Sequence, residues 1–175
     1  MSQWDEIAFI ESDGSNTQLV AAGLSQDYDD LHVIFEGFVN VSGTVNNGVV
    51  VRLNGDSSAA NYATEVMMLD GGSALFEGKI TNAVNGWTVY RLPAVISGNT
   101  GNWGYMSFDI IAYKQAVQRN CVAQHCTIQQ ANGSAMGAMG MTYKGTSAIT
   151  SVGVYAPSIA FGNKSTLTVY GLKNS

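Results

Sequence analysis

The chain has 175 residues, of which only 12% are charged, and its net charge is −5. A chain of this length can bury a core of its own, so we expect a single domain over residues 1–175. The sparse, scattered bases exclude a dense nucleic-acid-binding footprint, and no apolar run approaches the ~18 residues that span a membrane.

Short apolar and alternating runs separated by Gly and Asn turn signals dominate the sequence, and helical periodicity is nearly absent. In chain order the runs lie at residues 6–12, 18–24, 31–41, 48–54, 64–70, 74–84, 87–96, 103–114, 119–130, 148–156 and 165–172. This pattern predicts an all-β fold, an antiparallel β-sandwich of about ten strands that is jelly-roll-like.

Period-two alternation assigns faces to three of these runs. In the run 165–172, Leu167 and Val169 alternate with Thr166, Thr168 and Tyr170, and this run is expected to be a paired strand of the sandwich. Leu31, Val33 and Phe35 share one face of the run 31–41. Val49, Val51 and Leu53 are expected to face the core from the run 48–54, and we predict that these two runs pair through a turn at 42–48.

Two fragments carry a family resemblance. The first is RLNGDSSAANY at 52–62, and the second is STLTVYGL at 165–172, with Phe161 ahead of it. Together they resemble a module of tailed-bacteriophage virion proteins that reads roughly RFNGD-x-x-x-NY and, about a hundred residues later, F-x-x-G-S-x-x-x-L-Y-G-I. Leu53 stands where Phe is usual and Leu172 where Ile is usual, both conservative in volume.

The resemblance implies a structural protein of the virion, made in the host cytoplasm. Its most concrete form is a head-decoration protein that binds the major capsid protein on the outer shell. The alternative is an adaptor or receptor-binding domain of a tail or head fibre, with a host-surface glycan as a possible ligand. The chain has no coiled-coil or β-helical shaft such as a fibre usually requires, which favours head decoration.

The first fragment is predicted to be a turn rather than a reactive site. Asx turns and positive-φ positions account for its polar residues, since Asn, Asp and Gly are the usual turn formers. The motif turn comprises Asn54, Gly55, Asp56, Asn61 and Tyr62. A cation site at Asn54 and Asp56 is the less favoured alternative, because the spacing matches no EF-type loop.

No catalytic residue and no cofactor are predicted, so we expect that the chain is not an enzyme. His32 lies mid-strand and is expected to be packed or interfacial, and His125 adjoins Cys126, which alternation turns to the opposite face. The loop carboxylates Asp27, Asp29 and Asp30 are read as turn and surface residues, with a polysaccharide-degrading role as the minor alternative.

Cys121 and Cys126 are expected to be free, mostly buried thiols. The first residues carry acids where a signal peptide carries bases, which indicates a cytoplasmic product in which disulfides are rare. Structural zinc needs four ligands and no second cluster of ligands exists, so no metal is predicted.

Aromatic and methionine residues mark the candidate surface for contacts with other molecules. Trp4 and Trp87 can be core anchors, the commoner position for Trp, or contact platforms. The methionines belong to GSAMGAMGM, which is read as either a core strand or an intersubunit contact. The candidate interface comprises Trp87, Trp103, Tyr105, Met136, Met139 and Met141.

Charge is unevenly divided along the chain. All 13 acids precede Ile110, and from there on the chain has five bases and no acid. In an interleaved sandwich this division need not become a surface division. If it does, opposite patches would favour self-association head to tail, and we predict a homo-oligomer, most simply a trimer.

Overall fold

The computed structural model describes residues 3–40, 49–70, 75–81, 85–89, 94–95, 103–129, 133–156 and 159–173. These residues form strands and one short 3-10 helix, η1 (Ala59–Asn61). The strands are β1 (Gln3–Glu11), β2 (Gln18–Ala22), β3 (Asp30–Gly37), β4 (Val39–Asn40), β5 (Val49–Leu53), β6 (Tyr62–Asp70), β7 (Leu75–Thr81), β8 (Trp87–Val89), β9 (Ala94–Val95), β10 (Trp103–Ile110), β11 (Arg119–Gln129), β12 (Gly133–Tyr143), β13 (Ser151–Tyr155) and β14 (Thr166–Lys173).

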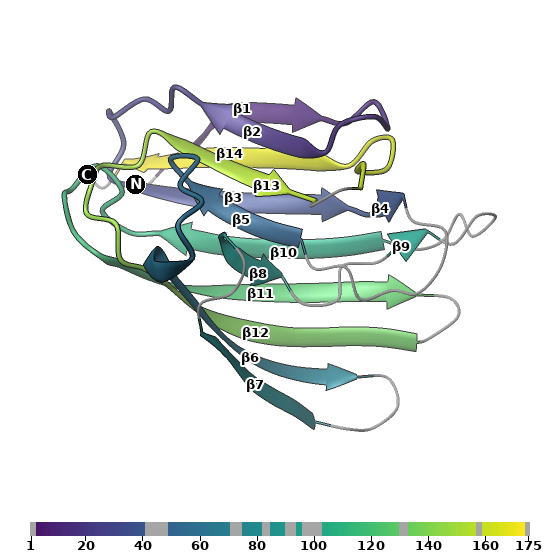
Figure 1. Cartoon of the computed structure of the whole chain (residues 1–175). Helices are drawn as coiled ribbons and strands as arrows, with labels where there is room; N and C mark the ends of the chain where they lie inside the picture. The colour runs from purple at the N-terminus through teal and green to yellow at the C-terminus, as the bar shows by residue number, and fades with distance from the viewer. Residues whose placement is uncertain are drawn as a thin grey trace.

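Two antiparallel sheets pack face to face (Figure 1). The larger sheet has eight strands in the order β1-β14-β3-β10-β11-β12-β6-β7, and the smaller has four in the order β2-β13-β5-β8. A short parallel pair, β4 and β9, lies beside them. The predicted antiparallel β-sandwich is confirmed, with its strands divided eight to four. No helix in the described part of the chain is long and apolar enough to cross a bilayer.

Alternation produces the core as predicted for β3, β5 and β14. The inward side chains of β3 and β14, such as Val33, Phe35 and Val169, are fully buried, and so are the inward valines of β5. Val50, which points away from the core, is also buried. Burial of one such side chain stabilises the fold by about 1.5–3 kcal/mol, so these alternating faces supply much of the driving force for folding.

The predicted pairing of β3 with β5 is wrong. β3 lies between β14 and β10 in the large sheet, whereas β5 lies between β13 and β8 in the small one. The chain therefore changes sheets between these two strands, which a local alternation pattern cannot reveal. The turn that was predicted to join them, at 42–48, lies outside the described residues.

The predicted run 103–114 ends as a strand at Ile110. Ala112 has a φ of 52°, a left-handed conformation that interrupts the extended backbone. The loop that follows is held by Arg119, whose guanidinium donates hydrogen bonds to the carbonyl oxygens of Tyr113, Gln115 and Val117. Burial lowers the pKa of Arg119. The connection between β10 and β11 is thus tied to the body of the sandwich.

The closing strand β14 is an internal strand of the large sheet, bonded to β1 on one side and to β3 on the other. Gly171 of the Tyr-Gly-Leu motif lies under the ring of Tyr28, and a Cβ there would come within 2.4 Å of that ring. Ser165 is buried and exchanges hydrogen bonds with the backbone of Phe38. The second motif therefore serves packing.

We predict that Val169→Asp unfolds the protein, because it buries an unpaired carboxylate at a position that is 0% exposed. Thermal unfolding followed by circular dichroism measures this. Val117→Asp is the matched control, since Val117 is 42% exposed, and it should leave the melting temperature within about 2 °C of wild type. A folded Val169→Asp variant would contradict the central placement of β14.

Candidate functional site

The first motif forms a corner where the chain passes from the small sheet to the large one. Asn54 and Gly55 have φ angles of 55° and 64°, and the amide of Asp56 donates to the carbonyl of Leu53 at 3.0 Å. Two consecutive positive φ angles in such a turn are what type I′ geometry requires. The structure has a turn at Asn54 and Gly55, and the strands that it joins lie in different sheets, whereas Tyr62 of the predicted motif turn is the first residue of β6.

The Asp56 carboxylate organises this corner. Oδ1 accepts from the backbone amide of Ser58 at 2.8 Å, and Oδ2 accepts from Asn61 Nδ2 at 2.7 Å and from the Tyr143 hydroxyl at 3.1 Å. Asn54, by contrast, bonds across to the segment 148–151 rather than to its own backbone. These contacts join the corner to Tyr143 of β12 and to the segment 148–151, which supports the interpretation of this motif as structural.

Tyr62 completes the corner from inside the core. Its hydroxyl accepts from the amide of Leu53 at 3.1 Å and donates to the carbonyl of Asp56 at 3.0 Å, and its ring is 1% exposed. Burial raises the pKa of Tyr62 far above its usual value, and burial with the nearby Asp56 raises the pKa of Tyr143 to about 12. Both hydroxyls stay protonated and donate at neutral pH.

We predict that Asp56→Asn destabilises the protein at neutral pH by about 1–3 kcal/mol, because hydrogen bonds to a charged acceptor are lost. Burial raises the pKa of Asp56, but the bonds from Ser58, Asn61 and Tyr143 together lower it below the usual 3.8. A carboxyl with a lowered folded pKa stabilises above its unfolded pKa and loses that contribution as pH falls below about 4.

The difference in unfolding free energy between wild type and Asp56→Asn should therefore shrink from pH 6 to pH 2 in urea titrations. Glu36→Gln is the matched control, since Glu36 is an exposed carboxylate on the outside of the large sheet. An Asp56→Asn effect that does not change with pH would contradict the assigned hydrogen bonds.

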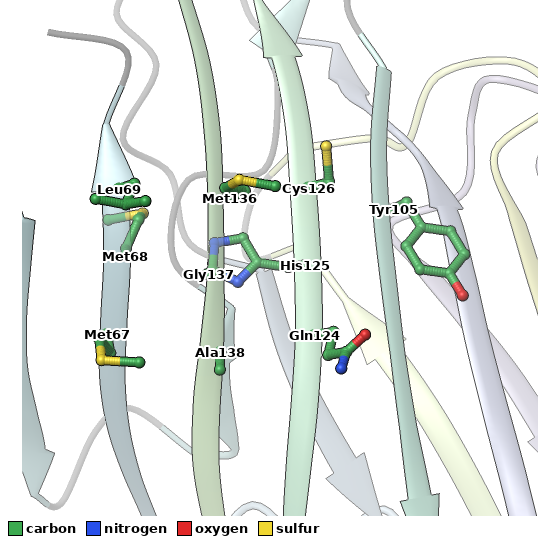
Figure 2. Close-up of a pocket in the computed structure, with 10 residues that line it drawn as sticks. All are labelled: Met67, Met68, Leu69, Tyr105, Gln124, His125, Cys126, Met136, Gly137 and Ala138. Carbon is green, nitrogen blue, oxygen red and sulfur yellow. The ribbon is translucent and has the colours of Figure 1, made fainter. Parts of the chain in front are cut away.

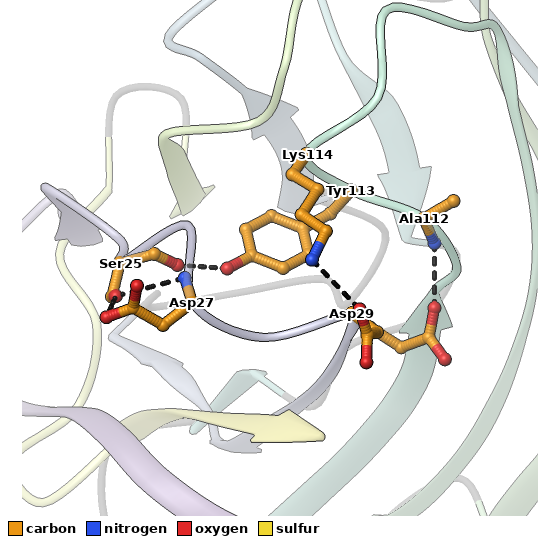
Figure 3. A network of polar contacts seen from close by, with 7 residues as sticks. Ser25, Asp27, Asp29, Ala112, Tyr113 and Lys114 are labelled. Carbon is orange, nitrogen blue, oxygen red and sulfur yellow. Dashed lines mark hydrogen bonds and ion pairs between the residues drawn. The ribbon is translucent and has the colours of Figure 1, made fainter. Parts of the chain in front are cut away.

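The loop carboxylates lie together at one end of the sandwich and hold two loops (Figure 3). Asp30 Oδ1 accepts from the amide of Ala112 at 2.7 Å, and Asp29 Oδ1 pairs with Lys114 Nζ at 2.9 Å. Asp27 bonds with Ser25, whose carbonyl accepts from the Tyr113 hydroxyl. These contacts support the interpretation of Asp27 and Asp29 as loop residues, whereas Asp30 is the first residue of β3.

The sequence-level division of charge is largely lost in the fold. Lys114 pairs with Asp29, Arg119 is buried, and Lys173 lies 5.0 Å from the ring centre of Tyr28. Three of the five late bases thus contact neighbours within the chain. The structure therefore does not support opposite charge patches as the basis of self-association.

The six residues of the candidate interface separate into two groups. Trp87, Met139 and Met141 are buried in the core, at 0%, 0% and 2% exposure, and cannot contact another molecule in this fold. Trp87 donates through Nε1 to the carbonyl of Thr142 at 2.8 Å and packs edge-on against Tyr62. The other three, Trp103, Tyr105 and Met136, are exposed on the side of the large sheet that faces away from the small one, called the outer face below.

An apolar patch occupies the outer face over β10, β11, β12 and β6. It comprises Met67, Leu69, Trp103, Tyr105, Val122 and Met136, which are between 37% and 68% exposed. At its centre lies an open groove of about 530 Å³, whose lining is drawn in Figure 2. Met67 and Leu69 were missed in the sequence, because their apolar run carries no sign of which face would be left uncovered.

The two cysteines lie on opposite faces of β11. Cys121 is buried and Cys126 is exposed at the edge of the groove. Five residues of extended strand separate their Cα atoms by about 17 Å, far more than a disulfide spans. The expectation of free thiols agrees with this placement, but Cys126 is not buried as expected. No group of three metal-binding side chains occurs among the described residues.

We predict that one thiol reacts in the native protein and two react after unfolding. Burial raises the pKa of Cys121 to about 12, so it is both covered and protonated at neutral pH. Titration with an aromatic disulfide reagent at pH 8 measures the number of reactive thiols. Cys126→Ser should abolish the native reaction, and Cys121→Ser should leave it unchanged. Two rapidly reacting native thiols would contradict the placement of Cys121.

The histidines lie on opposite faces of the large sheet. His125 is inward and 4% exposed, neither ring nitrogen has a partner in the described part of the chain, and burial lowers its pKa. His32 faces outward, and its Nδ1 lies 2.6 Å from Oδ1 of Asp109. Its ring packs against Trp4, with centroids 5.4 Å apart, and lies 6.4 Å from the ring of Tyr170. The sequence did not predict this cluster, because three strand pairings bring its members together.

Comparisons with known proteins identify no family. No family model matches the chain, and no curated protein matches it. Among solved structures, the carbohydrate recognition domain of Emp46p is 9% identical over 97% of this chain and 87% of that one, with a TM-score of 0.29. The enzymatically active domain of tailspike protein 2 of bacteriophage CBA120 is 8% identical over 99% of this chain and 29% of that one, with a TM-score of 0.33.

The carbohydrate-binding module (CBM40) of the Ruminococcus gnavus IT-sialidase, bound to α2,6-sialyllactose, is 14% identical over 96% of this chain and 91% of that one, with a TM-score of 0.27. At these TM-scores the likenesses establish neither a shared topology nor a shared function. The function must be argued from this chain's own surfaces.

Proposed function

We propose that the chain is a non-enzymatic structural protein of a tailed-phage virion that decorates the outer surface of the head. The resemblance of the two sequence motifs to modules of virion proteins supports a place for this chain in a phage particle. The observation that carries a docking role is the apolar patch on the outer face. Its six large apolar side chains are exposed, and four of them surround one groove, namely Met67, Leu69, Tyr105 and Met136. Contiguous apolar surface of this kind in a soluble domain usually marks a contact with another protein.

In this proposal the patch docks on the major capsid protein, and copies of the chain associate as a trimer. A shell offers a flat, repeated surface, and a broad β-sheet face is suited to it. Salt should have little effect on this contact, because burial of apolar area rather than ion pairing drives it.

The second candidate is a receptor-binding or adaptor domain at a tail or head fibre. The cluster of Trp4, His32 and Tyr170 favours it, since exposed aromatic rings are frequent in contacts with ligands. Copy number in the particle separates the two candidates. Hundreds of copies spread over the shell support head decoration, whereas a few tens or fewer at a tail or fibre support the second candidate.

We predict that Met67→Glu and Met136→Glu reduce binding to particles that lack the protein by at least about tenfold, because each places a charge in the dehydrated contact. Ile111→Glu is the matched control, since Ile111 is 59% exposed outside the patch, and it should bind as wild type does. Co-sedimentation with the particles, read at low and high salt, measures this. Wild-type binding by both methionine variants would overturn the docking surface.

Light scattering of the purified protein tests the trimer separately. A mass of three chains supports it, and a monomer at all protein concentrations contradicts it. Imaging of the particle then places the protein, and density confined to the tail tip would overturn head decoration.

A further inference from the structure

One cross-strand row on the outer face joins four neighbouring strands. Glu6 of β1 pairs with Tyr170 of β14, Tyr170 pairs with His32 of β3, and His32 pairs with Asp109 of β10. Trp4 lies two residues along β1 from Glu6 and reaches the His32 ring. The row lies about 13 Å from Tyr105 along β10, so it is separate from the centre of the apolar patch.

Three aromatic rings, two from the row and that of Trp4, border an open depression. A depression of about 340 Å³ is lined by Trp4, His32 and Tyr170. Trp4 is 48% exposed, so much of its indole is uncovered. Small-molecule sites range from about 300 to 1,000 Å³, and this volume therefore suits a single ring rather than an extended ligand.

Hydrogen-bond acceptors stand beside the rings. A carboxylate only accepts, so the short contact between His32 Nδ1 and Asp109 Oδ1 assigns the hydrogen to Nδ1. When the ring is neutral, Nε2 of His32 carries the lone pair, and this nitrogen has no hydrogen-bond partner in the described part of the chain. Asp109 is 55% exposed in its side chain and can accept further hydrogen bonds. The site thus combines apolar ring faces with acceptors for hydroxyl groups.

Charge selects among ligands of that kind. Glu6 and Asp109 lie at the two ends of the row. Neither the row nor the adjoining Trp4 contributes a lysine or an arginine. An anionic sugar would meet like charge at both ends of the row. An uncharged sugar meets no such repulsion, and its hydroxyl groups can donate to Nε2 and to the carboxylates.

We propose that this row is a binding site for one uncharged pyranose residue. The apolar face of the sugar packs against Trp4 and Tyr170, and its hydroxyls donate to His32 Nε2 and to Asp109. The site goes beyond head decoration, and it deepens the second candidate function because it names the ligand class that a receptor-binding domain would take. A cationic side chain of a protein, the other ligand of aromatic rings beside carboxylates, is an outcome of the test.

The test is binding of the purified full chain to oligosaccharides that end in glucose, galactose or mannose, compared with counterparts that end in sialic or uronic acid. Glycan-array binding followed by titration calorimetry measures it. We expect binding to at least one neutral terminus and at least tenfold weaker binding to the acidic counterparts. Binding to no neutral sugar, or a preference for acidic ones, overturns the proposal, as does binding only to lysine-rich peptides.

Variants locate the site. Trp4→Ala should weaken neutral-sugar binding by about tenfold or more, and Trp4→Phe, which keeps an aromatic face, should retain most of it. Phe9→Ala is the matched control, since Phe9 is a 54% exposed aromatic on the same strand and has no part in the row. Sugar binding that is equal in Trp4→Ala and Phe9→Ala overturns the assignment.

Asp109→Asn provides a second variant that leaves every ring in place. It should weaken neutral-sugar binding several-fold while the melting temperature stays that of wild type, because Asp109 is exposed. Unchanged binding contradicts the assigned hydrogen bonds. Failure of sugar binding leaves particle imaging and copy number unaffected, so the site and the proposed head location fail independently.

Discussion

The hydrogen-bonded corner around Asp56 is the constraint on which the two-sheet arrangement depends. It stands where the chain leaves the small sheet at Leu53 and enters the large one at Tyr62, and it must hold a turn that no ladder of strand bonds supports. The Asp56 carboxylate accepts hydrogen bonds from three donors. The buried hydroxyl of Tyr62 bonds to the turn from the core side. Polar groups therefore hold this crossing between the sheets, while the free energy of folding comes from the apolar layers.

The unequal widths of the two sheets determine where contacts with other molecules are possible. Eight strands on one side and four on the other give the large sheet a broad outer face. The face is chemically divided. Apolar side chains occupy the strands β10, β11, β12 and β6, and rings with acceptors occupy the strands from β1 to β10. One sheet can thus offer a protein-docking surface and a ligand site that do not overlap.

Sequence patterns predicted the parts of this structure that depend on near neighbours. Alternation assigned the inward faces of β3, β5 and β14, and the Asn-Gly dipeptide predicted a turn, since both depend on a few consecutive residues. Local patterns cannot predict the pairings between distant strands. The prediction gave β5 the wrong neighbour because no local signal marks a change of sheet. For the same reason the sequence does not decide between the two positions predicted for Trp87, a surface contact and a core anchor.

The candidate site illustrates the same limit. Tyr170, His32 and Asp109 are unremarkable in three separate runs, and only the register of β14, β3 and β10 brings them into one row. Met136 was found because its segment is unusual in composition, whereas Met67 and Leu69 belong to an ordinary apolar strand. Which apolar side chains remain uncovered depends on the register of the whole large sheet, which decides which side chains of each strand face away from the small sheet.

The position of β14 has a kinetic consequence. Among the described residues β1 pairs with β14 alone, and pairs such as Trp4 with Leu172 join residues from opposite ends of the described chain. Loop closure on that scale makes non-local pairing slow, and contacts of high sequence separation dominate this topology. The row from Glu6 to Asp109 cannot exist before those pairings form, whereas β11 and β12 can pair early as neighbours in the chain. In a nascent chain, the part of the apolar patch on β11 and β12 would therefore form before the row that joins Glu6, Tyr170, His32 and Asp109.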